Sequence, residues 1–160
     1  NSTVSITIDG YIEAVNKAIE SAVAVEGLDK VGTVSSVSAK TEDPAKVEIN
    51  TVVTAVGLDK DGKVVYAFAD ESQLKAAITG ATVVAGEELR TKGQQGNDYG
   101  MSENGMVEWD QQVKTLVDWT KGKNAEEIAK AGDEADVTST VSIYIGGFVS
   151  TLEAAVAAAK

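Results

Sequence analysis

Two versions of one segment decide the fold of this chain: TVSITIDGY at residues 3–11 and TVSIYIGGF at residues 140–148. Their offset is 137 residues (140 − 3), and the similarity continues to Ala22 and Ala159. In each copy, apolar residues first alternate with polar ones and then recur at helical spacing. A glycine stands where the spacing changes from strand-like to helical, and it allows the chain to turn sharply there. We therefore predict a similar strand–helix unit at each end of the chain.

Sequence typical of β-strands follows the first copy. Valine, threonine and serine dominate it, as they do in half-buried strands. Asp59-Lys60-Asp61-Gly62 separates two apolar-alternating runs and predicts a hairpin, with the glycine supplying a positive φ. The predicted strands are 31–39, 46–58, 64–68, 74–78 and 81–89, the last two joined around Thr79-Gly80.

A polar, glycine-rich stretch comes next, and we predict an irregular loop from Thr91 to Gly105. A helix is predicted from Met106 to Thr120, because apolar residues recur on one face. Asn124 and Glu127 have capping-box spacing and predict a short helix, after which an acidic loop leads to the last strand. Runs of strands followed by helices predict an α+β fold, in which helices cover an antiparallel or mixed sheet. No linker-like stretch divides the chain, so we predict a single domain over residues 1–160.

The composition excludes several classes of function. The chain has 160 residues, with 14 basic and 25 acidic side chains, and contains neither histidine nor cysteine. Zinc sites of Cys/His type, cysteine nucleophiles and imidazole chemistry are therefore absent. A net charge of −11 argues against nucleic acid, which requires clustered Lys and Arg. No apolar run approaches the ~18 residues that span a bilayer, and we predict no transmembrane segment. Nor do we predict a metal site, because the glycine of 59–62 comes too early for an EF-hand.

The glycine-rich stretch holds the candidate binding residues. They are Arg90, Lys92, Asp98, Tyr99 and Trp109. Arg90 suits either an anion clamp or a surface pair with a carboxylate. Tyr99 suits either a stacking surface or a residue that fixes the loop, whereas Trp109 is expected mainly in the core. Glu108 and Asp110 flank Trp109 and are expected to be solvated.

One short motif raises the alternative of a flavin. Thr79-Gly80-Ala81-Thr82 is similar to the motif by which some flavin-binding domains carry FMN on the final threonine. Thr82 would be the acceptor here. That motif has an aspartate where this chain has Ala76, and a tight turn between strands explains the same residues.

Most of the chain resembles a group of proteins through residues that are structural in character. The shared features are Thr91-Lys92, Gly96-x-Asp98-Tyr99-Gly100-Met101, Glu108-Trp109, Gly122-Lys123 and Asp136-Val137-Thr138. They resemble exported proteins and lipoproteins of Gram-positive anaerobes, some of which are similar to FMN-binding domains. The resemblance implies an extracellular or cell-surface location, with the export signal outside residues 1–160. It implies no catalytic residue.

We expect a non-catalytic extracytoplasmic domain that binds a small molecule, a glycan or a protein through the surface from Arg90 to Trp109, without a cofactor. One alternative is an electron-transfer module that carries FMN at Thr82. A second alternative is a structural repeat of a larger surface protein, which the two similar terminal segments suggest.

Overall fold

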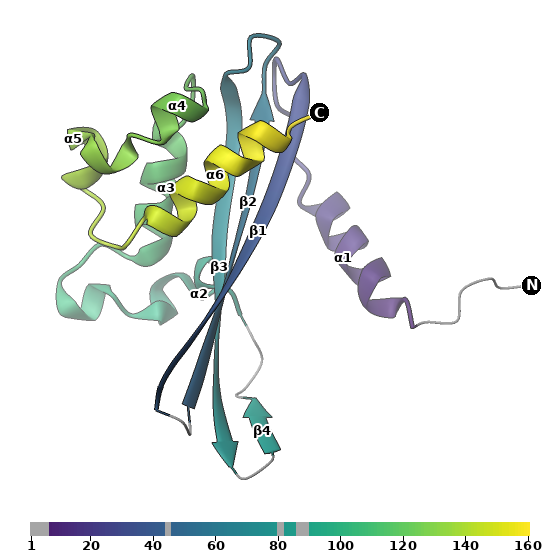
Figure 1. Cartoon of the computed structure of the whole chain (residues 1–160). Helices are drawn as coiled ribbons and strands as arrows, with labels where there is room; N and C mark the ends of the chain where they lie inside the picture. The colour runs from purple at the N-terminus through teal and green to yellow at the C-terminus, as the bar shows by residue number, and fades with distance from the viewer. Residues whose placement is uncertain (1–6, 44–45, 80–81, 86–89) are drawn as a thin grey trace, which may run out of the picture.

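The computed structural model describes residues 7–43, 46–79, 82–85 and 90–160. Its centre is one antiparallel sheet in which neighbours in sequence are neighbours in space, in the order β1-β2-β3-β4 (Figure 1). The strands are β1 (Lys30–Asp43), β2 (Lys46–Leu58), β3 (Val64–Thr79) and β4 (Thr82–Ala85). With the helices below, this sheet confirms the predicted α+β class.

The turn between β2 and β3 confirms the predicted hairpin. Asp59 accepts hydrogen bonds from the backbone amides of Asp61 and Lys63 through its side chain, at 2.9 and 2.8 Å. Gly62 has a φ of +74°, which only glycine adopts without strain. Beyond the turn, β3 pairs with β2 over nearly its whole length, so the segments predicted at 64–68 and 74–78 belong to one long strand.

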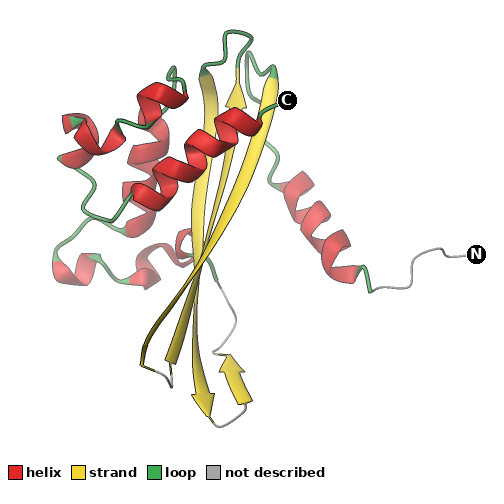
Figure 2. Ribbon diagram, viewed as in Figure 1, coloured by secondary structure: helices red, strands yellow, loops and turns green. Residues whose placement is uncertain are grey.

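Six α-helices complete the described part of the chain. They are α1 (Asp9–Glu20), α2 (Lys92–Gln95), α3 (Trp109–Trp119), α4 (Ala125–Ile128), α5 (Ala135–Thr138) and α6 (Gly146–Ala158). Helix α6 packs on β1 and β2, α3 packs on β3, and α4 packs on α6. Figure 2 shows that α2 to α6 gather along one part of the sheet, which extends well beyond them, while α1 lies apart.

The core lies where α3 and α6 meet the sheet. Trp109 packs edge to face against Phe148 at a ring-centroid distance of 5.7 Å. Leu116 and Leu152 are fully buried. At Gly32 of β1, an added Cβ would lie only 1.9 Å from the Ala155 carbonyl oxygen, so the helix contacts the strand backbone directly. The absence of a side chain at residue 32 therefore determines how closely α6 approaches the sheet.

The predicted pair of terminal strand–helix units is not present in the structure. Val141–Ile145 is not a strand, because the amides of Ser142 and Ile143 donate to the Gln112 side chain of α3 instead of to a neighbouring strand. The matching residues 4–6 lie outside the described residues. The helices of both units are present, although α1 buries none of its side chains.

The glycine-rich stretch is more regular than predicted. Residues 91–105 contain α2 and two 3₁₀ turns, Gly96–Tyr99 and Ser102–Asn104. Helix α3 begins at Trp109, three residues after the predicted start, and Met106 is 43% exposed. The acidic loop after α4 includes the single turn of α5. These turns were missed because such short helical segments carry no apolar period.

Candidate functional site

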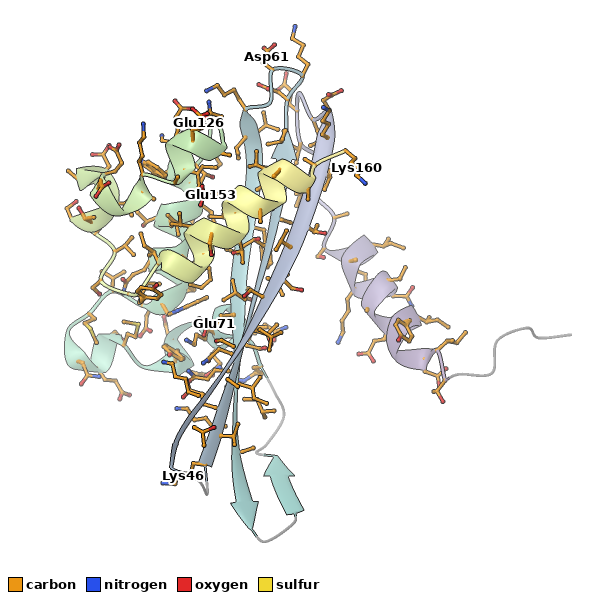
Figure 3. All side chains as sticks on the ribbon, viewed as in Figure 1. Lys46, Asp61, Glu71, Glu126, Glu153 and Lys160 are labelled. Atoms are coloured by element: carbon orange, nitrogen blue, oxygen red, sulfur yellow. The ribbon has the colours of Figure 1, made fainter. Side chains whose placement is uncertain are left out.

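The sheet face beneath the helices changes from apolar to polar along its length. Thr54 and Val56 of β2 are buried under the helices. Further along the same face come Glu48 and Asn50 of β2, because side chains alternate with a period of two. Glu71 of β3 lies at the middle of the sheet in Figure 3, between the helices and the uncovered end near Lys46. The polar side chains begin where the helices end.

Helix α2 is closed at its start by a capping box and is attached to the sheet through Asp70. The Thr91 hydroxyl and the Gln94 side chain form a capping box around its first turn. The Gly93 amide donates to the Asp70 carboxylate at 3.0 Å, and a Cβ at residue 93 would lie 2.9 Å from that carboxylate. Asp70 therefore holds the backbone of α2 directly against β3.

Lys92 carries the buried charge of the site. Its Nζ lies 3.1 Å from Glu71 Oε1, with side-chain exposures of 8% and 13%. The same ammonium lies 5.2 Å from the Tyr99 ring centre and 5.5 Å from that of Trp109. Burial of an unpaired charge is costly, so the carboxylate and the two rings compensate the ammonium for lost water. Lys92 thereby joins the sheet, α2 and the aromatic residues.

A chain of hydrogen bonds crosses the strands beside this pair. The Gln73 amide donates to Asn50 Oδ1 at 3.1 Å, and the Asn50 amide donates to Glu48 Oε1 at 2.9 Å. The Asn50 bond is the main cause that lowers the pKa of Glu48, with Lys75 and Lys40 contributing more weakly. Glu48 is therefore ionised at neutral pH and has further lone pairs to offer.

These groups form the floor of an open cleft of about 400 Å³, which we call the polar cleft. Its lining comprises Lys40, Glu48, Asn50, Glu71, Gln73, Lys92, Tyr99, Met101, Trp109, Ile143, Tyr144 and Phe148. Two lysines balance two glutamates, so the lining carries no net formal charge. Tyr144 is 87% exposed, and its ring lies against Gly146 at the start of α6, where a Cβ would be 2.5 Å from the phenol oxygen.

Three of the five predicted site residues meet in the polar cleft: Lys92, Tyr99 and Trp109. Trp109 is only 3% exposed, which confirms the prediction that it lies mainly in the core. It therefore supports Lys92 and Tyr99 from below instead of facing solvent. Arg90 and Asp98 instead pair with each other at 3.0 Å on the surface and are not part of the lining.

Glu108 was predicted to be solvated, and that prediction is wrong. Only 7% of the residue is exposed. Its carboxylate accepts hydrogen bonds from the Ser102 hydroxyl and from the amides of Ser102 and Met101. The Ser102 hydroxyl bond is the main cause that lowers the pKa of Glu108. Glu108 thus fixes the loop that follows Tyr99.

The polar residues of the sheet were missed altogether. Glu48 and Asn50, like Glu71 and Gln73, are two residues apart and therefore share a face. Their register confirms it, since Asn50 lies opposite Gln73. The signal was visible in the sequence, because the alternate positions that hold Glu48 and Asn50 early in β2 hold mostly apolar residues later in the strand. The sequence prediction had placed the site in the glycine-rich stretch alone.

Trp109 also borders a second hollow, of about 520 Å³, which α2, α3, β3 and Ser21 after α1 line together. Phe68, Val113 and Val117 line much of it. It gathers fewer polar side chains than the polar cleft does, and we therefore take the polar cleft as the candidate site.

Thr82 begins β4, but Gly80 and Ala81 before it lie outside the described residues, so the flavin motif stays a prediction. Within the described ranges, no group of three or more acidic residues could hold a metal ion. The same ranges contain no helix with the length and hydropathy needed to cross a membrane. No protein family, no curated protein and no solved structure matches this chain.

Proposed function

We propose that this protein is a non-catalytic binding module whose polar cleft takes a neutral, hydroxyl-rich ligand, of which a glycan is the natural example. The observation that carries the proposal is the hydrogen-bonded floor of Gln73, Asn50 and Glu48 lying open beside exposed Tyr144. Planar amides and carboxylates suit sugar hydroxyls as donors and acceptors, and an exposed aromatic ring suits the apolar face of a sugar.

The charge balance of the cleft favours a neutral ligand over an ionic one. Lys92 is already paired with Glu71 and lies over two rings, so it is not available as an isolated anion clamp. A glycan ligand also agrees with the extracellular or cell-surface setting in Gram-positive bacteria that we propose from the resemblance described above. A peptide or a small metabolite is the competing outcome.

Calorimetric titration with a panel of neutral oligosaccharides tests this function. For an oligosaccharide that binds, Tyr144→Ala and Gln73→Ala each weaken the affinity by about three- to tenfold, since single contacts contribute roughly 0.5–1.5 kcal/mol. Two controls lie outside the cleft: Tyr11→Ala, which removes an exposed tyrosine of α1, and Arg90→Ala. Binding that is absent across the panel, or that falls as much in the controls, contradicts the proposal.

An electron-transfer module carrying FMN at Thr82 is the second candidate, favoured only by the motif at 79–82 and by the same resemblance. Co-expression with a flavin transferase, followed by intact-mass measurement, tests it. An FMN-sized increment that disappears in Thr82→Ala supports covalent attachment. An unchanged mass in both proteins excludes it.

A further inference from the structure

Helix α1 presents an apolar face that nothing in the described structure covers. Tyr11, Ile12, Val15 and Ile19 are between 50% and 69% exposed. A single helix of twelve residues is marginal in water, and the stability of such helices usually comes from packing of the apolar face. Figure 1 shows α1 lying apart from α2 to α6, although Ser21 directly after it lines a hollow with residues of α3 and β3. The face therefore requires a partner surface.

The pattern of apolar positions in α1 matches that in α6. Phe148, Leu152 and Ala155 are buried in α6, and at an offset of 137 they correspond to the apolar Tyr11, Val15 and Ala18. Conversely, Ser150, Ala154 and Ala157 are exposed in α6. Their counterparts in α1 are the charged residues Glu13, Lys17 and Glu20. The three positions that are buried in α6 are apolar in α1, and the three exposed positions are charged in α1.

Two details indicate that α1 fits the position that α6 occupies on β1 and β2, and not just any apolar surface. Ala155 is where α6 meets the backbone at Gly32, and α1 keeps alanine there as Ala18. The segment before the helix is also kept: Ser142 and Ile143, which bind Gln112, correspond to Ser5 and Ile6. The residues that the two segments share are therefore those that place α6 on β1 and β2.

We propose that α1 is the closing helix of a second copy of this unit, which precedes residues 30–160 in the same polypeptide and whose sheet α1 covers as α6 covers this one. The interface is already visible within this chain, between α6 and the sheet. In this chain α6 already occupies that position on the sheet, since its Leu152 and Ala155 are fully buried there. Residues 21–30 between α1 and β1 span up to about 30 Å when extended, enough to join two such units.

A two-unit chain tests the proposal. Residues 30–139 are joined directly to residue 3 of the complete chain, so that α1 takes the place after the first sheet that α6 takes after the second. We expect both units to fold. NMR spectra should then show twice the number of dispersed amide signals, or pairs of nearly coincident signals from corresponding residues, and both copies should resist protease. A first copy that stays unfolded and is digested away overturns the proposal.

Matched variants of α1 assign the contact. Val15→Asp, at the position of Leu152, unfolds the first copy and leaves the second intact. Lys17→Asp, at the exposed position of Ala154, leaves both folded. A chain in which residues 146–158 replace residues 9–21 sets the reference stability for a correctly closed first copy. If Val15→Asp instead destabilises the second copy, α1 belongs to the unit it precedes and the proposal is wrong.

Two further observations test the order along the polypeptide. Light scattering shows whether the two-unit chain is a monomer; folding of the first copy only within dimers would place α1 on another molecule and overturn the proposal. The coding sequence upstream of residue 1 should continue the same unit, with glycine at the position of Gly32. Upstream sequence that does not align with residues 30–139 also overturns it.

Discussion

Helix α6 buries Phe148, Leu152 and Ala155 against the sheet, whereas α1 leaves the corresponding Tyr11, Val15 and Ala18 exposed. Both segments have the same apolar spacing, and both form helices. The difference lies in what surrounds them. An amphipathic pattern specifies which face of a helix is to be buried, but the burial itself depends on a surface of matching shape. Among the described residues, α6 buries its apolar face against the sheet, whereas α1 buries none of its side chains.

The largest contrast is expected at the centre of the two helices. Leu152→Ala should destabilise the protein by about 2–5 kcal/mol, because it leaves a cavity at a fully buried site. Val15→Ala, the same kind of truncation at the matching position, should change the free energy of unfolding by less than about 0.5 kcal/mol. Urea unfolding followed by tryptophan fluorescence measures both. Equal effects would show that α1 is packed in solution.

The contact between helix and strand is expected to give the next largest effect. Gly32→Ala places a methyl group against the Ala155 carbonyl and should cost about 1–3 kcal/mol as α6 is displaced. Gly10→Ala in α1 meets nothing within 4 Å and should be neutral or slightly stabilising, since alanine is the better helix former. Thermal unfolding of both variants is the measurement. A tolerated Gly32→Ala would mean that α6 sits further from β1.

The segment that precedes α6 is expected to give a third, smaller loss of stability. Gln112 is 1% exposed and accepts hydrogen bonds from Ser142 and Ile143 while donating to the Val107 carbonyl at 2.6 Å. Gln112→Ala leaves these part-buried backbone groups without their partner and should cost about 1–2 kcal/mol. Gln111→Ala, on the exposed side of α3, is the control. Faster hydrogen exchange of the Ser142 and Ile143 amides should accompany the loss.

The smallest expected difference between the packed helices and α1 is in the dependence of stability on pH. The pKa values of Glu108 and Glu13 are both lowered, by Ser102 and by Lys17 respectively. A carboxyl whose folded pKa lies below its unfolded value stabilises the fold above the unfolded pKa, and this contribution is lost as the pH falls through the folded pKa. Glu108 is part of the packed layer, whereas Glu13 lies on uncovered α1.

Denaturant unfolding between pH 6 and pH 3 measures this difference. Glu108→Gln should weaken the dependence of global stability on pH in that window, because one linked proton is removed. Glu13→Gln should leave the dependence as it is in the parent chain. A parent-like profile for Glu108→Gln would mean that the Ser102 contact is not maintained in solution.

Features set by local sequence were predictable. The hairpin at 59–62 and the capping box of Asn124 with Glu127 follow from a few adjacent residues, and the structure confirms both. The interval 141–145 was predicted as a strand, since its alternation is strand-like. It is not one, because a glutamine thirty residues away takes its amides. Such a contact between distant residues does not change the local alternation of apolar and polar residues, so the sequence pattern cannot reveal it.

The candidate site was predictable in part for the same reason. Lys92 and Tyr99 were found because they stand together in one polar stretch. Glu71 and Asn50 come from strands whose register was not known, so their proximity to Lys92 required the assembled sheet. Arg90 was grouped with them by sequence distance alone, although it points to a separate surface pair with Asp98.

The pairing of Lys160 with Val31 has a mechanical consequence. Two backbone hydrogen bonds of 3.3 Å join these residues in antiparallel fashion at one end of the sheet, near the labelled Lys160 in Figure 3. A pulling force applied between Lys30 and Lys160 therefore acts across these bonds and opens them one after the other, as in unzipping, instead of shearing the long strands. Under tension α6 should peel away first, at low force, and extend the chain while the hairpins of the sheet remain intact.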